Sequence, residues 1–193
     1  MEYTIIYSEH FKPIFWSGGT STELYIFPQT ADYQQRNFLF RLSMATVETE
    51  KSDFTLLFGT SRKLMVLHGK ITLCHEDHYS RLLNKFDIDE FEGDWKTSSV
   101  GKGTDFNLIT TGKTTGEISA VVIEKEKRVN CNVKENSDWF FIYVYSGKVT
   151  ISIDNKITTI NKGDLLILNK PSTRNFGIKS IENSELVFAE ITL

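Results

Sequence analysis

Proline and cysteine are scarce in this chain, and each shortage narrows what the protein can be. Three prolines in 193 residues leave long stretches able to pair as β-strands. The two cysteines, Cys74 and Cys131, lie far apart and in no metal-like spacing. We therefore expect two reduced, buried thiols and no disulfide framework.

Long apolar runs and an excess of positive charge are missing as well. No apolar run approaches the roughly 20 residues that a membrane-spanning helix needs. The first residues do not show a basic segment followed by an apolar one, which is the pattern of a signal peptide. The formal net charge is -3, whereas a surface that binds nucleic acid is basic. We therefore expect a cytoplasmic protein that binds neither membranes nor nucleic acid.

Aromatic residues and short alternating runs are what the chain has instead. Fourteen Phe and seven Tyr favour β-strands, and strand signals cover residues 38–47, 63–74, 117–124 and 139–168. Within the last of these, apolar and polar residues alternate over 149–154, which is the period of a half-buried strand. Helical periodicity is almost absent. Residues 80–86 predict one turn of helix at most, and residues 86–105 predict a structured loop. The sequence thus predicts an all-β protein.

A strand–glycine–strand pattern occurs twice in the chain. The run LMVLHGKITL at residues 64–73 resembles FIYVYSGKVTISI at residues 141–153, and the two turn glycines are about 78 residues apart. The pattern is similar to the core of a cupin barrel. We therefore predict a bicupin of two antiparallel β-barrels. The first barrel would occupy residues 1–115, with a pocket and a covering loop, and the second residues 116–193. Exchange of strands between the two halves is left open.

The histidine cluster of a metal-binding cupin is missing from both predicted barrels. Such cupins hold a first-row metal with a His-x-His pair, a Glu and a later His. Counting back from the turn glycines puts Arg62 and Phe140 at the Glu position, and the late His position falls near Phe176. His75 and His78 belong to a His-Glu-Asp-His run at the end of a strand. We interpret them as solvated hairpin residues, not as a zinc site. No metal and no other cofactor is expected.

Polar residues on otherwise apolar strands indicate a pocket in the first half of the chain. Both faces of the strand at residues 38–47 are mainly apolar, so Arg41 is expected to be buried. Because an unpaired buried charge is costly, Arg41 needs a partner. The small Ser43 shares its face and leaves space for a carboxylate, which a guanidinium fork fits well. The alternative is an internal ion pair with Glu23 or Asp105 and no ligand.

Three further features point toward the same pocket. Arg62 stands where a metal cupin has an inward-pointing ligand, so we expect it to point inward; the alternative is a solvated residue. Asp105 and Asn107 have the same parity and could face one site. Gly18 and Gly19 allow a close approach of the backbone or a positive φ, although a plain turn would explain them equally well.

Taken together, these segments resemble the HutD/Ves family. The matching pieces stand in the family's order: WSGGTSTE at 16–23, Pro28, FRLSMA at 40–45, Phe54, Phe58-Gly59, Arg62, Leu67, Gly69, FEGD at 91–94 and DFNL at 105–108. The resemblance implies a bicupin-type fold and, for some members, a link to histidine utilisation. It also implies a polar, ligand-binding pocket in the first barrel, formed by Trp16, Thr20, Glu23, Arg41, Ser43, Arg62, Asp105 and Asn107.

Three kinds of function remain open at this point. The first is a binding module that holds a small anionic or zwitterionic metabolite, such as an amino-acid catabolite, as a sensor or regulator in histidine or amino-acid metabolism. The second is a metal-independent cupin enzyme, an isomerase or hydrolase, with Glu23 or Asp105 as general base. The third is an interaction protein with a vestigial pocket. No nucleophile–base pair is visible, so we favour the binding module and name no catalytic residue. A homodimer is left open.

Overall fold

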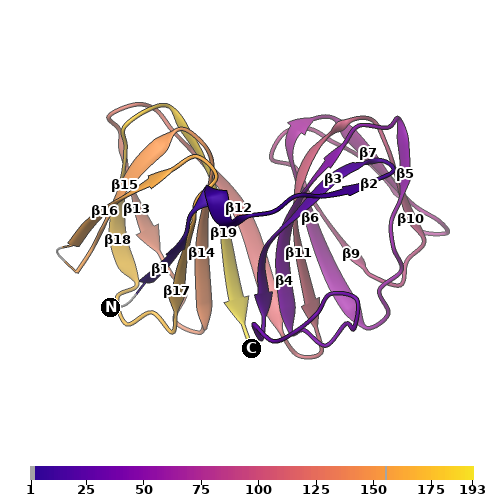
Figure 1. Ribbon diagram of the computed structural model, residues 1–193, viewed down its shortest axis with the longest axis horizontal. Helices are drawn as coiled ribbons and strands as arrows, with labels where there is room; N and C mark the ends of the chain where they lie inside the picture. The colour runs from indigo at the N-terminus through magenta and orange to yellow at the C-terminus, as the bar shows by residue number, and fades with distance from the viewer. Residues whose placement is uncertain (1–2, 155) are drawn as a thin grey trace. The chain divides into compact units, whose positions relative to one another are not determined.

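The chain is built almost entirely from β-strands (Figure 1). The computed structural model describes residues 3–154 and 156–193, which form the strands β1 to β19 and one short 3-10 helix, η1 (Ser8–His10). In this described part of the chain, no helix is long and apolar enough to cross a membrane. The predicted all-β class is confirmed.

The strands divide between two compact units. The unit made of residues 11–115, called here the pocket unit, contains β2 (Ile14–Trp16), β3 (Gly19–Phe27), β4 (Phe40–Val47), β5 (Lys51–Asp53), β6 (Thr60–Gly69), β7 (Ile71–His75), β8 (Ser80–Leu83), β9 (Ile88–Glu92), β10 (Thr97–Val100) and β11 (Gly103–Thr111).

The second unit combines the residues up to His10 with those from Gly116 onward. It contains β1 (Tyr3–Ile6), β12 (Thr115–Ile123), β13 (Arg128–Asn132), β14 (Trp139–Ser146), β15 (Lys148–Ile153), β16 (Lys156–Asn161), β17 (Leu165–Asn169), β18 (Asn175–Ser180) and β19 (Ser184–Thr192). The first strand of the chain therefore pairs inside this unit, where β1 lies antiparallel to β17.

Both units share a core strand order of four strands in each sheet. In the pocket unit a six-stranded sheet runs β2-β3-β4-β11-β6-β9 and a four-stranded sheet runs β5-β10-β7-β8. In the second unit a five-stranded sheet runs β1-β17-β14-β19-β12 and a four-stranded sheet runs β13-β18-β15-β16. The order β4-β11-β6-β9 thus corresponds to β12-β19-β14-β17, and β5-β10-β7-β8 corresponds to β13-β18-β15-β16. The predicted antiparallel strands are present, but each unit has two separate sheets, not the predicted closed barrel.

The turns that join the repeated strands are equivalent too. Gly69, between β6 and β7, and Gly147, between β14 and β15, both have φ 81. A Cβ atom added at either glycine would come within 2.4 Å of a backbone oxygen, that of Lys102 or of Asn183. Because a positive φ and a close approach of the backbone both favour glycine, the same requirement fixes this residue at both turns.

Two local predictions were wrong, and the same region explains both. Residues 80–86 do not form a turn of helix, because β8 occupies residues 80–83. Residues 86–105 are not a loop, because β9 and β10 lie within them. In β9 the buried positions are held by Asp89 and Phe91. With a carboxylate at one of the inward positions, the alternation of apolar and polar residues could not be recognised.

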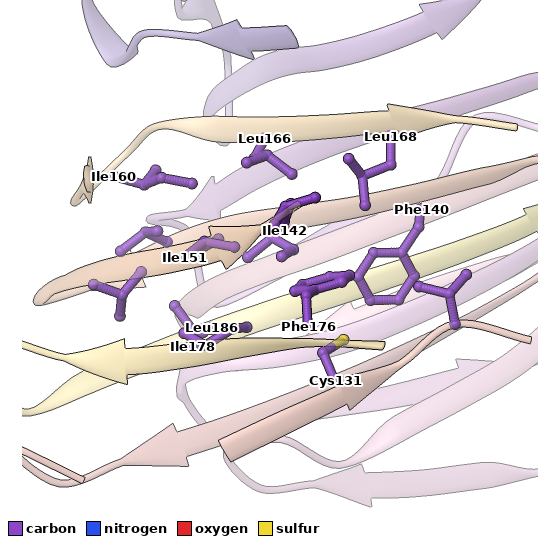
Figure 2. Close-up of a cluster of buried hydrophobic side chains, with 14 of the residues drawn as sticks. Cys131, Phe140, Ile142, Ile151, Ile160, Leu166, Leu168, Phe176, Ile178 and Leu186 are labelled. Atoms are coloured by element: carbon purple, nitrogen blue, oxygen red, sulfur yellow. The ribbon is translucent and has the colours of Figure 1, made fainter. Parts of the chain in front are cut away.

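The two units differ in what fills the space between their sheets. In the second unit the buried cluster is apolar, with Phe140 and Ile142 of β14 beside Phe176 and Ile178 of β18 (Figure 2). The alternation predicted for residues 149–153 is confirmed, since every second side chain there is buried.

In the pocket unit the corresponding apolar cluster comes from β6, β7, β8 and β9. It contains Leu64, Val66, Ile71, Leu73, Leu83 and Phe91. None of these residues belongs to β3 or β4. A smaller apolar cluster contains Ile26 of β3 and Ile109 of β11. Beside these residues, β4 contributes two buried polar side chains, Arg41 and Ser43.

Candidate functional site

Two arginines lie side by side on the six-stranded sheet of the pocket unit. Arg41 of β4 and Arg62 of β6 are both cross-strand partners of Ile109 in β11, the strand between them. Because side chains directly opposite one another in a sheet project from the same face, Arg41 and Arg62 project from the same face as Ile109.

The next rows of this face continue the polar surface. Asn107 of β11 is paired with Ser43 of β4, and Ser43 is paired with Glu23 of β3. One row further along, Asp105 is paired with Ala45. Sequence periodicity alone placed Asp105 with Asn107 and Arg41 with Ser43. The strand register shows that the two pairs are neighbours.

These rows border a cavity of about 340 Å³. The cavity is lined by Trp16, Ser21, Tyr33, Arg41, Ser43, Ala45, Val47, Ser52, Asp53, Phe54, Thr55, Arg62, Asp105, Asn107 and Ile109. A volume of this size suits a small organic molecule, and the mixture of apolar walls with a few convergent polar groups is typical of a ligand site.

Arg41 is buried and already has a counter-ion. Its side chain donates a 2.8 Å hydrogen bond from Nε to Glu23 and a 2.9 Å hydrogen bond from Nη1 to Ser43. The guanidinium carbon also lies 4.3 Å from the centre of the Tyr33 ring, a cation–π contact. The predicted burial of Arg41 is confirmed, and Glu23 is the partner that neutralises it.

Arg62 is equally buried, at 8% exposed, but is only partly satisfied. Its Nη1 reaches the carbonyl oxygen of Thr55 at 3.5 Å, and the guanidinium lies 4.9 Å and 5.2 Å from the rings of Phe54 and Phe91. Its Nε is buried and has no hydrogen-bond partner among the residues that the structure describes. Burial lowers the pKa of Arg62 to about 10, so the group is still charged at neutral pH.

Asp105 is the third buried charge-bearing group in the cavity, at 3% exposed. Burial raises the pKa of its carboxyl group to about 7, against the opposing effects of a hydrogen bond from Asn107 and the charge of Arg62. Asn107 donates that bond from Nδ2 to Oδ1 of Asp105. Near neutral pH this carboxyl group can therefore exist in both protonation states.

The residues that the sequence suggested as ligand contacts do not all lie at the cavity. Those that line it are Trp16, Arg41, Ser43, Arg62, Asp105 and Asn107. Glu23 is not among the lining residues, but it forms an ion pair with Arg41, which is. Thr20 is not among the lining residues; it pairs with Phe15 on one side and Thr46 on the other.

Sequence reasoning missed the aromatic rings that stack on the two guanidinium groups. Tyr33 lies in the segment between β3 and β4, which has no periodicity from which its position could be inferred. Phe54 gave a usable signal, because it is one of the residues that carry the family resemblance. Both rings shield a charge from water, which strengthens the electrostatic interactions of that charge.

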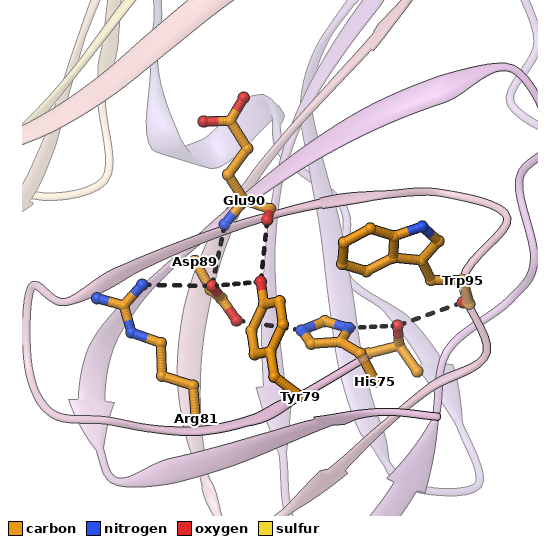
Figure 3. Close-up of polar contacts among 7 residues, drawn as sticks. His75, Tyr79, Arg81, Asp89, Glu90 and Trp95 are labelled. Carbon is orange, nitrogen blue, oxygen red and sulfur yellow. Dashed lines mark hydrogen bonds and ion pairs between the residues drawn. The ribbon is translucent and has the colours of Figure 1, made fainter. Parts of the chain in front are cut away.

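A second polar cluster lies elsewhere in the pocket unit, around His75. The His75 side chain is fully buried, so the expectation of a solvated hairpin was wrong for this residue. Its Nε2 lies 3.1 Å from the Asp89 carboxylate, and its Nδ1 lies 2.8 Å from the Thr97 hydroxyl (Figure 3). Tyr79 and Arg81 also donate to Asp89. Burial is tolerated because each ring nitrogen has a partner.

His78 and His75 do not form a shared site. His78 is exposed, as expected, and stacks on Trp95 with ring centres 3.8 Å apart. Within the residues that the structure describes, no group of three or more His, Cys, Asp or Glu side chains is arranged to hold a metal ion. Cys74 and Cys131 form no disulfide, and burial raises the pKa of Cys131 to about 12.

The equivalent place in the second unit has a different chemistry. The residue that matches Arg62, counted from the turn glycine, is Phe140. Its ring packs against those of Phe176 and Phe188, with centres 6.1 Å and 5.4 Å away. A cavity of about 170 Å³ remains beside Phe140, and neither Arg nor Lys is among its lining residues. The arrangement suited to an anion is thus found at the cavity of the pocket unit.

Comparison with known proteins gives both fold and family. The structure superposes on a conserved protein of unknown function from Pseudomonas aeruginosa PAO1, with TM-score 0.84, 20% identity and 100% of each chain covered. HutD from Pseudomonas fluorescens SBW25 superposes with TM-score 0.74 and 18% identity, and the match covers 99% of this chain and 98% of that chain. YhhW from Escherichia coli superposes with TM-score 0.74 and 10% identity, and the match covers 98% of this chain and 97% of that chain. At such identities these likenesses establish the fold alone.

No curated protein sequence matches the chain. The sequence model of the HutD family matches residues 8–187, which is nearly the whole chain. The resemblance seen in the sequence is thereby confirmed. The chain belongs to the HutD family.

Proposed function

We propose that this protein is a HutD-type bicupin that binds a small carboxylate in the cavity of the pocket unit. The observation that carries the proposal is the buried Nε of Arg62, which has no hydrogen-bond partner within residues 3–154 and 156–193 and belongs to a side chain lining the cavity. A buried donor without a partner costs free energy, about 1–3 kcal/mol and more for a charged group. A ligand oxygen would remove that cost.

The charges of the site favour an anionic ligand. Arg41 is neutralised by Glu23. Arg62 forms no ion pair with any residue in the described part of the chain, and its charge is shielded by Phe54 and Phe91. A carboxylate matches the planar fork of a guanidinium group. Among common metabolite groups, a carboxylate therefore satisfies this cavity well.

Repetition of the strand order supports the bicupin part of the proposal. Both units share one topology and keep the same turn glycine. The biological role we propose is that of a cytoplasmic sensor or regulator in histidine or amino-acid metabolism, and this follows only from the family. A homodimer would be compatible with that role.

A direct test compares two variants that remove the same charge. Carboxylates of increasing size, beginning with formate, should raise the melting temperature of the wild-type protein, because a ligand that binds only the folded state stabilises it. Formate is a rational first probe because HutD of P. fluorescens SBW25 has a structure from a formate condition. Arg62→Met should abolish the shift.

Arg128→Met is the matched control for that test. Arg128 is exposed on β13 of the second unit, so its removal changes the net charge equally without altering the cavity. If no carboxylate in the series raises the melting temperature of the wild-type protein, the proposed function is contradicted. Protection that survives in Arg62→Met would show that the ligand binds elsewhere.

A metal-independent enzyme is the second candidate, and one observation favours it. A carboxyl group with a pKa of about 7 is suited to general-base work near neutral pH, and Asp105 has that property. Glu23 is less suited, because its carboxylate is engaged by Arg41. Incubating each stabilising compound with the protein and following it by NMR separates the two candidates. Conversion by wild-type protein, lost in Asp105→Asn, would favour the enzyme.

A further inference from the structure

We propose that the cavity binds its carboxylate together with a proton, which resides on Asp105 and forms a hydrogen bond to the ligand. The inference rests on the proposed function of this cavity and specifies the ligand further. A neutral Asp105 is a hydrogen-bond donor, so the part of the ligand that faces it must be an acceptor. A neutral Asp105 therefore favours a simple carboxylate over a zwitterion, because the ammonium group of a zwitterion would need an ionised Asp105 as its partner.

The position of Asp105 within the sheet makes a free carboxylate unfavourable. Its cross-strand neighbours are Ala45 on β4 and Val66 on β6, neither of which can neutralise a charge. Within the described part of the chain, its carboxyl group accepts a hydrogen bond from Asn107, at Oδ1. The structure shows no ion pair of Asp105 with any residue it describes. A buried carboxyl group in such surroundings tends to keep its proton.

The other charged and titratable groups around the cavity do not supply a counter-ion. From β3 and β4, Glu23 and Arg41 neutralise each other. Arg62 of β6 acts on Asp105 through its charge and lowers the pKa, yet burial outweighs it and raises that pKa to about 7. Asp53 of β5 and Tyr33 of the β3–β4 segment also line the cavity, and neither of them is a cation.

Binding of a ligand carboxylate would favour the protonated form of Asp105 further. The ligand brings a negative charge into a cavity that already contains the Asp105 carboxyl group, and two nearby carboxylates raise each other's pKa. Arg62 then provides the positive charge and Asp105 provides the donor. A buried carboxylic acid kept neutral so that it can donate a hydrogen bond is an established device in proteins.

The pH dependence follows from the direction of this shift. Below about pH 7 Asp105 already carries its proton, so binding takes up none and the affinity is constant. Above that pH the free protein has lost the proton and must regain it on binding. The affinity for a carboxylate should therefore fall by up to about tenfold for each pH unit above neutrality.

Calorimetric titration of the full-length protein with sodium formate provides the test. Measurements at pH 6 and pH 8.5, each in two buffers of different ionisation enthalpy, give the affinity and the number of protons taken up. We expect weaker binding at the higher pH, with uptake approaching one proton. Asp105→Asn keeps a donor but cannot titrate, so its affinity should be the same at both pH values.

Asp53→Asn is the matched control for Asp105→Asn, because Asp53 is an exposed carboxylate of the same cavity. It should retain the pH dependence of the wild type. Formate binding with equal affinity at both pH values, or with release of a proton, would overturn the inference and leave the proposed function intact. Absence of binding by formate and larger carboxylates at either pH would overturn both.

A second readout does not need a ligand. Infrared spectra at pH 6 should contain the carbonyl band of a protonated carboxyl group that is missing from Asp105→Asn, and the band should disappear by pH 8.5. A wild-type spectrum without this band at pH 6 would contradict the inference, whatever the cavity binds.

Discussion

Arg41 and Arg62 lie on opposite sides of Ile109, each as its cross-strand partner, and they differ in what neutralises them. Glu23 forms an ion pair with Arg41 at 2.8 Å. Arg62 contacts two aromatic rings and leaves Nε without a partner. One guanidinium is therefore neutralised within the fold, and the other keeps a buried hydrogen-bond donor that no described residue satisfies.

The ion pair of Arg41 should contribute moderately to stability. We expect Arg41→Met to lower the free energy of unfolding by about 1–2 kcal/mol. This is less than the 3–5 kcal/mol typical of breaking a fully buried pair, because the Glu23 side chain is 38% exposed and can be hydrated when its partner is removed. Urea unfolding of Arg41→Met, Glu23→Gln and the double variant gives the coupling energy, which should be about 1 kcal/mol. Purely additive effects would show that the pair contributes nothing.

Asp105 should make stability depend on pH in a defined direction. Its pKa is raised on folding from 3.8 to about 7, so the folded state holds the proton more tightly than the unfolded state. The resulting stabilisation is complete below about pH 4 and is lost as pH rises to about 7. Asp105→Asn removes this dependence. Its advantage over wild type should therefore grow across that window, to at most about 4 kcal/mol. Unfolding curves of the two proteins at pH 4, 5.5 and 8 check this, and parallel profiles would contradict it.

The cluster around His75 should be the most sensitive polar site of the pocket unit. Asp89 lies within hydrogen-bond distance of His75 and accepts hydrogen bonds from Tyr79 and Arg81. Tyr79 and Arg81 are exposed and can be hydrated when Asp89 is removed, whereas the His75 side chain is fully buried. Asp89→Ala leaves this buried ring nitrogen without its partner, so we expect a loss of about 1–3 kcal/mol in denaturant unfolding. Glu90→Gln alters the next residue, whose carboxylate is exposed, and should change stability by less than about 0.5 kcal/mol. Equal effects of the two substitutions would show that the buried network contributes little.

The two turn glycines should resist substitution to a similar degree. Gly69→Ala and Gly147→Ala combine a positive φ with a Cβ that would lie 2.4 Å or less from neighbouring atoms. Gly112 has φ 64 but open space around it, so Gly112→Ala measures the backbone strain alone, about 1–2 kcal/mol. Both turn variants should lose clearly more than this control in thermal unfolding. A loss no larger than that of Gly112→Ala would show that the strands separate easily at these turns.

Features that depend on local alternation could be predicted from the sequence. The strand with Val149, Ile151 and Ile153 was evident because each inward residue is apolar and each outward one is polar. The burial of Arg41 followed from its position between apolar residues on both faces. In both cases the prediction needs only the residues of one strand, because successive side chains point to opposite faces of the sheet.

Features that depend on contacts between distant strands could not be predicted. The sequence does not predict β9 as a strand, because Asp89 takes an inward position and its partner His75 is on β7. The place of Tyr33 over Arg41 is set by the path of the segment between β3 and β4, which has no periodic pattern. Arg41 and Arg62 lie in one row because β11 pairs with β4 and β6 in a particular register. This register cannot be inferred from the sequence of any single strand.

The repeated strand order allows the interiors of the two units to differ on similar backbones. The glycines that shape the equivalent turns, Gly69 and Gly147, are the same in both units, whereas the equivalent interior position is Arg62 in one and Phe140 in the other. Because the turns are shared and the interior side chains are not, one scaffold accommodates a charged interior in one unit and an apolar interior in the other.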